Sequence, residues 1–399
     1  MKKKSSALQS SRTLLLLWMS HFLVDIMIGF WSVYKTLAQL DLAIAGLIAG
    51  VSPFIGEGMQ VLFGPLGDRG YRKALVIFGL GACSSSIFLP YTTDYTLLFL
   101  IYLLTCIGSG AFHPSAVATA STITKESKGF FISIFASGGA VGMAISHMLF
   151  SLCHHVYGGN TAILIVPVLL IMGLVLSTDL PNPLEEGQKK HLGMKTILGL
   201  FKQPNLLALY ITQVCNQAIF WGVIFLLPDA LIAKGYESWI CFGGGHFFFI
   251  LGGAAMMIPA GMLSDRYSPK NVLFFTGFSG LLLFYIFILS PLLMDFAILG
   301  LLFCLGAALG VVSPVVIAFG NRMIPSRPGL VSAFLMGLAW CISESIGPGG
   351  GGLLTACFEE LAAVKALACF GFLFVTGMGA TLFLPREETE EIQLEKISL

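Results

Sequence analysis

Apolar runs, each about as long as a helix that crosses a bilayer, recur along this chain and are separated by short polar turns. A transmembrane helix needs about 20 mainly apolar residues. Charged residues make up only 11% of the chain, against roughly 25% in a soluble domain. The pattern predicts an all-α integral membrane protein with twelve transmembrane helices. The predicted spans are 13–34, 42–64, 73–91, 95–121, 128–152, 161–178, 205–230, 240–263, 271–290, 294–322, 329–356 and 361–384.

The distribution of Lys and Arg orients these spans. If the N-terminus is cytoplasmic and the chain alternates sides, only Lys35, Lys234 and Lys365 of the 22 basic residues lie outside. Cytoplasmic loops are the ones rich in Lys and Arg, and an error of one helix would destroy this asymmetry. We therefore expect both termini in the cytoplasm. The first apolar run is too long for the apolar region of a signal peptide, so no cleaved signal is expected.

The cysteines and the net charge exclude several kinds of site. The nine cysteines are odd in number, lie mostly within predicted spans and show no Cys-x-x-Cys spacing. Neither a disulfide framework nor a zinc site is predicted, and no metal or other cofactor is expected. The net charge of +1 comes with no basic patch, so no nucleic-acid partner is expected. The predicted partners are the lipid bilayer and a small-molecule substrate.

A charged loop occurs twice, at matching places in two groups of six spans. Residues 64–73 read GPLGDRGYRK and residues 261–270 read GMLSDRYSPK, so Asp68 corresponds to Asp265. The repeat predicts two pseudo-symmetric six-helix halves joined by the only long hydrophilic break. The predicted boundaries are 1–180 for the N-terminal half, 181–204 for a cytoplasmic linker, 205–386 for the C-terminal half and 387–399 for an acidic cytoplasmic tail. Internally repeated membrane proteins are mostly transporters.

The repeat extends beyond the loops. The segment 110–114 (GAFHP) in the fourth span matches 310–314 (GVVSP) in the tenth. His21 and Asp25 in the first span correspond to Gln213 and Gln217 in the seventh. The second match is the weaker one, because two polar residues one turn apart are a common pattern.

The first loop resembles the loop motif of the major facilitator superfamily, Gly-x-Leu-x-Asp-Arg-x-Gly-Arg-Lys, and the likeness covers nearly the whole chain. It implies a monomer whose two halves rock about a central cavity. It also implies that Asp68 faces the positive N-terminal end of the span opened by Pro328 and Gly329, while Gly64 allows close helix packing. A loop that only sets topology is the alternative. The residues assigned to gating are Gly64, Asp68, Arg69, Arg72, Lys73, Asp265 and Arg266.

Four further segments resemble the fosmidomycin resistance protein family, bacterial inner-membrane drug exporters of the same superfamily. They are 20–25 (SHFLVD), 108–114 (GSGAFHP), 133–142 (SIFASGGAVG) and 328–332 (PGLVS). The chain departs from that family in having Ala118 and Ser121 where an arginine often follows the Phe-His-Pro element. The resemblance implies export of a small compound from the cytoplasm.

Acidic residues inside the predicted spans are candidates for proton coupling. They are Asp25, Glu57 and Glu344. A charge at the bilayer centre costs about 2.5–3.5 kcal/mol on insertion scales, so each carboxyl must face water, contact a partner or hold a proton. His21 lies one helical turn from Asp25, and we expect Asp25 to carry the proton with His21 tuning it. The alternative is a structural hydrogen-bonded pair, and Glu57 and Glu344 have the same alternative as locks between the halves.

A second set of polar and aromatic residues is expected to line the substrate cavity. The set is His113, Gln213, Asn216, Gln217, Trp221 and Trp340. His113 precedes Pro114, which removes one backbone donor and bends the helix, so the imidazole faces the cavity or caps the freed carbonyl. For the residues of the seventh span, the alternative is helix–helix hydrogen bonding, which is worth about 1–2 kcal/mol or less.

The combined sequence features favour a proton-coupled antiporter that exports a small amphipathic compound or drug. A proton-coupled importer of a small metabolite is the main alternative, since a proton site fixes no direction. A membrane-embedded enzyme would need a reactive cluster of residues, and none is predicted. An ATP-driven pump would need a Gly-x4-Gly-Lys-Ser/Thr loop, which the chain lacks. A sensor would be expected to carry an added soluble domain, and none is predicted.

Overall fold

The computed structural model describes residues 2–123, 128–181, 199–325, 330–331 and 333–385, and every regular element in those ranges is a helix. The first group is α1 (Lys2–Leu37), α2 (Leu42–Gly58), α3 (Gln60–Leu66), η1 (Gly67–Tyr71), α4 (Arg72–Cys83), η2 (Ser84–Tyr91), α5 (Tyr95–Thr122), α6 (Lys128–Val156), η3 (Ala162–Leu164) and α7 (Ile165–Leu176). The second group is η4 (Leu200–Lys202), α9 (Pro204–Ala233), η5 (Ile240–Gly244), α10 (Gly245–Arg266), α11 (Pro269–Leu289), α12 (Asp295–Gly310), α13 (Val312–Met323), η6 (Ala333–Leu338), α15 (Ala339–Glu344), η7 (Ser345–Gly350), α16 (Gly351–Thr355), α17 (Ala362–Ala368) and α18 (Gly371–Thr381).

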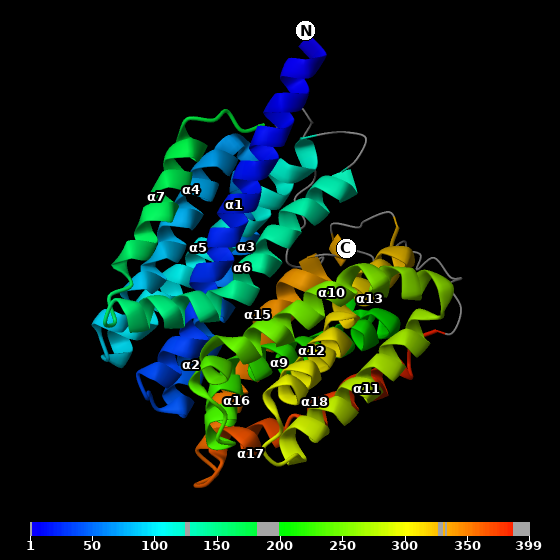
Figure 1. Cartoon of the computed structure of the whole chain (residues 1–399). Coiled ribbons are helices and arrows are strands. Elements are labelled where there is room, and N and C mark those ends of the chain that lie inside the picture. Colours follow the sequence, from blue (N-terminus) through cyan, green and yellow to red (C-terminus); the bar gives the residue numbers. More distant parts are fainter. Residues whose placement is uncertain (1, 124–127, 182–198, 326–329, 332, 386–399) are drawn as a thin grey trace. The chain divides into compact units, whose positions relative to one another are not determined.

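The chain divides into two compact units. The first unit holds Met1–Leu40 and Val51–Lys189, and the second holds Asp41–Gly50 and Lys190–Leu399. In the first unit α1 packs most extensively on α6, and α4 on α5; in the second, α10 packs on α12 and α9 on α18 (Figure 1). The predicted linker lies largely, and the predicted acidic tail wholly, outside the described residues.

The membrane-crossing helices agree with the predicted spans. Nine described helical runs are long and apolar enough to cross a bilayer. One of them, Leu42–Tyr91, continues for 50 residues and contains two predicted spans. The run Ala162–Leu176 is shorter, and the eleventh predicted span is divided because π-helical turns interrupt it at η6 and η7. Pro348 lies inside η7, where its missing N–H breaks the regular helical ladder.

Glycine pairs allow a close helix crossing in each unit. A Cβ atom on Gly110 would lie less than 3.0 Å from the carbonyl oxygen of Gly56, and one on Gly310 would meet Gly253 equally closely. Gly110 and Gly310 are partners in the sequence repeat, and the two crossings occupy corresponding places in their units. Small residues let helix backbones approach in membrane proteins. The two halves therefore correspond in helix packing as well as in sequence.

Lysine side chains tie the start of one helix to the end of another in each unit. Lys73 Nζ, at the start of α4, donates to the carbonyl of Leu176 at the end of α7 over 2.8 Å. Its counterpart Lys270, at the start of α11, donates to the carbonyl of Leu384 just beyond α18 over 2.9 Å. A cation at a helix C-terminus offsets the negative end of the helix dipole. Each duplicated loop therefore fixes the last helix of its own unit.

Candidate functional site

The first unit brings together three ionisable side chains that the sequence had placed in two separate sets. His21 and Asp25 lie one turn apart on α1, and His113 lies on α5. His21 Nε2 is 3.5 Å from Asp25 Oδ2, and His113 Nε2 is 3.4 Å from Asp25 Oδ1. The side chains of His21, Asp25 and His113 are 9%, 16% and 23% exposed. We call these three residues the ionisable trio.

Backbone and hydroxyl groups hold both imidazoles of the trio. His21 Nδ1 lies 2.8 Å from the carbonyl oxygen of Phe135 on α6, and the two rings stack with centroids 4.2 Å apart. His113 Nδ1 lies 3.0 Å from both the carbonyl and the hydroxyl oxygen of Ser109. His113 thus contacts the carbonyl of Ser109, one turn back, and directs its other nitrogen toward Asp25. The carbonyl that Pro114 leaves without a donor is that of Gly110, four residues before the proline.

Glycine at position 139 makes room for the trio. A Cβ on Gly139 of α6 would come within 3.0 Å of His21 Nε2 and of Asp25 Oδ2. The glycine run of the fifth predicted span therefore packs directly against the ionisable groups, a contact that the sequence analysis did not anticipate. No sequence pattern could have shown it, because it depends on how α1 crosses α6.

Glu57 lies beside the trio, and Glu344 belongs to the second unit. Glu57, near the end of α2, is half-buried and accepts a hydrogen bond from Gln60. It is close enough to His113 and Asp25 to interact electrostatically with both. Glu344 ends α15 in the second unit. Of these two acidic candidates, Glu57 therefore belongs to the same group of charges as Asp25.

The second unit carries a neutral counterpart at the three equivalent positions. Gln213 Nε2 donates to Ser313 Oγ over 2.8 Å, and Gln217 Nε2 donates to the same oxygen over 2.5 Å. Gln213, Gln217 and Ser313 correspond in the repeat to His21, Asp25 and His113, and we call them the neutral trio. The weaker sequence match between the first and seventh spans thus coincides with an equivalent spatial cluster.

Several polar atoms of the predicted substrate cavity are buried without a hydrogen-bond partner in the described structure. They are Gln213 Oε1, Trp221 Nε1 and Trp340 Nε1. Buried polar atoms are usually hydrogen-bonded, to protein or to water. An acceptor and two N–H donors in one unit are therefore available to water or to a bound molecule.

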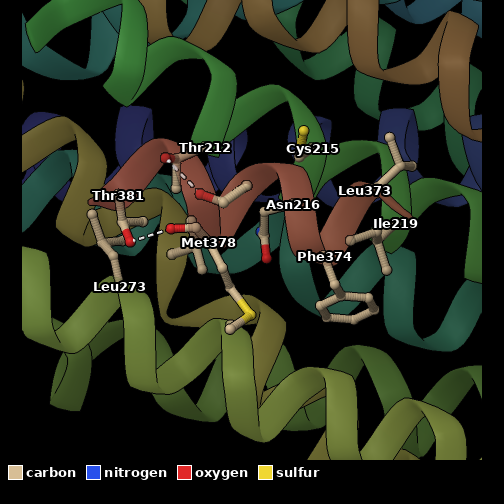
Figure 2. Close-up of a pocket in the computed structure, with 12 residues that line it drawn as sticks. Thr212, Cys215, Asn216, Ile219, Leu273, Leu373, Phe374, Met378 and Thr381 are labelled. Atoms are coloured by element: carbon tan, nitrogen blue, oxygen red, sulfur yellow. Dashed lines mark hydrogen bonds between the residues drawn. The ribbon is translucent and has the colours of Figure 1, made fainter. Parts of the chain in front are cut away.

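Asn216 has a different setting from its neighbours. Its Nδ2 donates to the carbonyl of Leu309 on α12 over 3.0 Å, the helix–helix hydrogen bond given above as the alternative. It also lines a small pocket between α9, α11 and α18 that has room for about one water molecule. Figure 2 shows Thr212, Cys215, Asn216 and Ile219 of α9 and Leu373, Phe374, Met378 and Thr381 of α18 around it. This pocket is too small for an amphipathic substrate.

The first charged loop is held by an internal ion pair. Gly70 has φ +100°, the left-handed conformation that lets the chain turn from α3 into α4. Arg72 Nη2 is 3.3 Å from Asp68 Oδ1, and Arg72 Nη1 donates to the carbonyl of Ala118 on α5. Arg72 is buried and Arg69 is exposed. Asp68 thus contacts an arginine of its own loop, while Pro328 and Gly329, its expected neighbours, lie outside the described residues.

Gly64 and Gly67 differ in their surroundings among the described residues. A Cβ on Gly64 would meet no described atom within 4 Å, and residues 326–329, which include the loop's expected neighbours, lie outside the described part of the chain. The close approach lies three residues later, at Gly67, where a Cβ would lie 3.3 Å from Ser115 Oγ.

The second charged loop turns by a different backbone route. Tyr267 and Ser268 are extended, and Pro269 opens α11 as its first residue. Proline is favoured there because its fixed φ suits the first helical turn. Arg266 is exposed, and the side chain of Asp265 lies outside the described residues.

Comparison with known proteins identifies the family. The model of the Major Facilitator Superfamily matches residues 13–348. The chain is 24% identical to the MFS-type transporter YuxJ of Bacillus subtilis (strain 168) over 392 residues, covering 90% of this chain and 95% of the relative. It is also 24% identical to the benzoate transport protein of Acinetobacter baylyi (strain ATCC 33305 / BD413 / ADP1) over 280 residues, 58% of this chain and 59% of that protein.

Solved structures agree in fold. A point mutant of the nucleoside transporter NupG matches with a TM-score of 0.75 at 17% identity, over 93% of this chain and 99% of that one. A bacterial homolog of the human lysosomal transporter Spinster, in an inward-facing and unoccupied conformation, matches with a TM-score of 0.72 at 15% identity, over 94% and 95% of the two chains. The predicted fold of twelve helices in two pseudo-symmetric halves is thereby confirmed. The chain belongs to the major facilitator superfamily and is an integral inner-membrane transporter of small molecules rather than an enzyme.

Proposed function

We propose that this transporter is proton-coupled and exports a small amphipathic compound by alternating access, as a monomer with both termini in the cytoplasm. The observation that carries the proposal is the contrast between the two trios. In the neutral trio, the three corresponding positions carry only amide and hydroxyl groups, which hydrogen-bond to one another. Ionisable groups within a membrane are costly and mark functional sites by default, and the ionisable trio places three of them together.

Each site residue has a proposed role. Asp25 takes up and releases the coupling proton, His21 and His113 share it, and Glu57 adjusts the charge around them. Glu344 is a second acidic candidate in the other unit. Gln213, Gln217, Trp221 and Trp340 in the second unit contact the substrate through buried polar atoms and rings, and His113 is the substrate residue of the first unit. Asn216 holds α9 against α12. The proposed gating residues are Gly64, Asp68, Arg69, Arg72, Lys73, Asp265 and Arg266.

The direction of transport is proposed from the resemblance to the fosmidomycin resistance protein family, whose members are drug exporters. The names of two similar proteins, a benzoate transport protein and a nucleoside transporter, favour a metabolite as substrate and state no direction of transport. Both alternatives share a small-molecule substrate.

Proteoliposomes with an imposed pH gradient separate the two directions. Purified protein is reconstituted, the membrane potential is clamped at zero, and a panel of labelled antibiotics, nucleosides and aromatic acids is screened. A proton antiporter accumulates its substrate when the lumen is acidic, because protons leaving the lumen drive the substrate in. Accumulation only when the outside is acidic would establish symport instead. Transport of a panel compound at the same rate under all gradients would contradict proton coupling.

A further inference from the structure

We propose that the ionisable trio is also a binding site for one divalent transition-metal ion of the zinc class. Its three donors are the two imidazole Nε2 atoms of His21 and His113 and the carboxylate of Asp25. The inference goes beyond proton coupling and does not depend on the direction or substrate of transport. Sequence spacing predicted no metal site, because the donors come from two helices that are far apart in the chain.

The donor set suits such an ion. Zn²⁺ binds imidazole nitrogen and carboxylate oxygen, and sites with three protein ligands leave a fourth position open to water or another ligand. Imidazole also suits copper, iron and nickel, whereas Mg²⁺ and Ca²⁺ prefer oxygen ligands alone. Two imidazoles and one carboxylate therefore select a transition metal over the hard cations.

The distances between the donors fit a tetrahedral ion. Donors that lie 2.0–2.1 Å from a tetrahedral metal are about 3.4 Å from one another. The His21 Nε2–Asp25 Oδ2 distance is 3.5 Å and the His113 Nε2–Asp25 Oδ1 distance is 3.4 Å. All donor atoms lie within 4.8 Å of one another. Each imidazole thus lies at about the tetrahedral separation from one oxygen of Asp25.

The hydrogen bonds of the rings leave their lone pairs facing the carboxylate. The carbonyl of Phe135 can only accept, so His21 Nδ1 carries the hydrogen of that bond. In the neutral ring Nε2 then presents a lone pair to Asp25 Oδ2. His113 does the same when Nδ1 donates to the carbonyl of Ser109. Metal-binding histidines commonly donate their second N–H to a backbone carbonyl, which fixes the ring and the tautomer.

One oxygen of the carboxylate has an unsatisfied capacity for a ligand. Asp25 Oδ1 is a buried atom with no hydrogen bond in the described structure, although His113 Nε2 lies 3.4 Å away. Lone pairs that converge without a hydrogen between them repel one another. A proton relieves one nitrogen–oxygen pair at a time, whereas a metal ion satisfies all three donors at once.

Gly139 supplies a variant that changes the geometry of the site and keeps every donor. In Gly139→Ala the new methyl group would come within 3.0 Å of both His21 Nε2 and Asp25 Oδ2 and force them apart. Gly142→Ala is the matched control. Its methyl group would collide equally closely with the backbone of Phe22, so it strains the same α1–α6 packing one turn away without touching a donor.

The proposal is tested by cobalt binding to the full-length protein, purified through a tag that contains no histidine. Co²⁺ replaces Zn²⁺ in such sites and gives visible d–d absorption. We expect one Co²⁺ per chain, displaced by Zn²⁺. Asp25→Asn, His113→Gln and Gly139→Ala should each weaken binding by at least about 10–100-fold. Gly142→Ala and His155→Gln, which changes an exposed histidine, should bind as the unmodified protein does, and size-exclusion profiles and melting curves verify that every variant is folded.

Three outcomes would overturn the proposal. The unmodified protein could bind no Co²⁺ at micromolar concentration, or could retain its d–d band after Asp25→Asn and His113→Gln are combined. A sulfur-to-cobalt charge-transfer band in the near ultraviolet would assign the metal to cysteine instead. Equal weakening by Gly139→Ala and Gly142→Ala would likewise show that helix packing, rather than donor geometry, controls binding.

Discussion

At the scale of single residues, the two trios share a similar arrangement of side chains but differ in whether those side chains can ionise. His21, Asp25 and His113 meet around a carboxylate, and Gln213, Gln217 and Ser313 meet around a hydroxyl. The neutral trio can hold helices together by hydrogen bonding, but it cannot bind or release a proton near neutral pH. This contrast supports the proposal that the ionisable trio in the first unit is the main site of cation coupling.

Removal of the Ser313 hydroxyl should destabilise the second unit. In Ser313→Ala, two buried amide groups lose their shared acceptor, which costs about 1–3 kcal/mol when a buried donor stays unsatisfied. The expected result is a lower melting temperature in detergent. Ser279→Ala is the control, because its exposed hydroxyl bonds only to a carbonyl of its own helix. Equal melting of the two variants would show that the neutral trio adds no stability.

At the scale of helices, each unit repeats the same contacts. The glycine crossings at Gly56/Gly110 and Gly253/Gly310 occupy corresponding places, as do the helix-end contacts of Lys73 and Lys270. A third lysine, Lys234, donates to the carbonyls of Ile288 and Ser290 at the end of α11, and burial lowers the pKa of its ammonium group. Helix ends in this protein are thus commonly held by lysine.

Alanine at either glycine crossing should loosen its unit. Gly110→Ala and Gly310→Ala each place a methyl group against a backbone carbonyl that cannot move aside, and overpacking of this kind costs about 1–3 kcal/mol. Both variants should melt below the unmodified protein. Gly300→Ala, on the same helix as Gly310, should melt at or above it, since a Cβ there meets nothing within 4 Å. Unchanged melting of both crossing variants would contradict the packing described.

Loss of the duplicated lysines should destabilise each unit independently. Lys73→Met and Lys270→Met remove a charge at a helix C-terminus, which is worth about 0.3–1 kcal/mol. Because the two lysines share no partner, their effects should add in the double variant. The exposed Lys202 provides the control as Lys202→Met. A double variant no less stable than that control would rule out a stabilising role for these contacts.

The sequence predicted the helices better than the site. Apolar length and loop charge were sufficient for the spans, because the bilayer imposes both. The π-helical turns around Pro348 were not predicted, since they depend on how a glycine-rich helix packs. His113 was predicted in the substrate set rather than beside Asp25, because periodicity within one helix does not tell which side chain on another helix it meets. The repeat matched Ser313 to His113 in the sequence, but its hydrogen bonds to two glutamines could be found only from the three-dimensional structure.

At the scale of the whole molecule, the duplicated loops should lie on one face of the membrane. Tyr71 and Tyr267 are exposed in the two loops, and Tyr157 is exposed in a turn predicted on the opposite side. Cysteine at position 71 or 267, in a background lacking the exposed Cys304, Cys357 and Cys369, should react with an impermeant maleimide only in inverted vesicles. Cysteine at position 157 should react in intact cells. Labelling of positions 71 and 267 from opposite sides would contradict the two-half topology.

The central claim is that the ionisable trio couples proton movement to transport, and Asp25→Asn tests it most directly. Once a substrate is identified, the variant is compared with the unmodified protein in the same proteoliposomes for two activities. Exchange of labelled for unlabelled substrate at equal pH needs no net proton transfer, whereas accumulation along a pH gradient does. We predict that Asp25→Asn keeps exchange and loses accumulation. An Asp25→Asn variant that still concentrates substrate as the unmodified protein does would contradict the account.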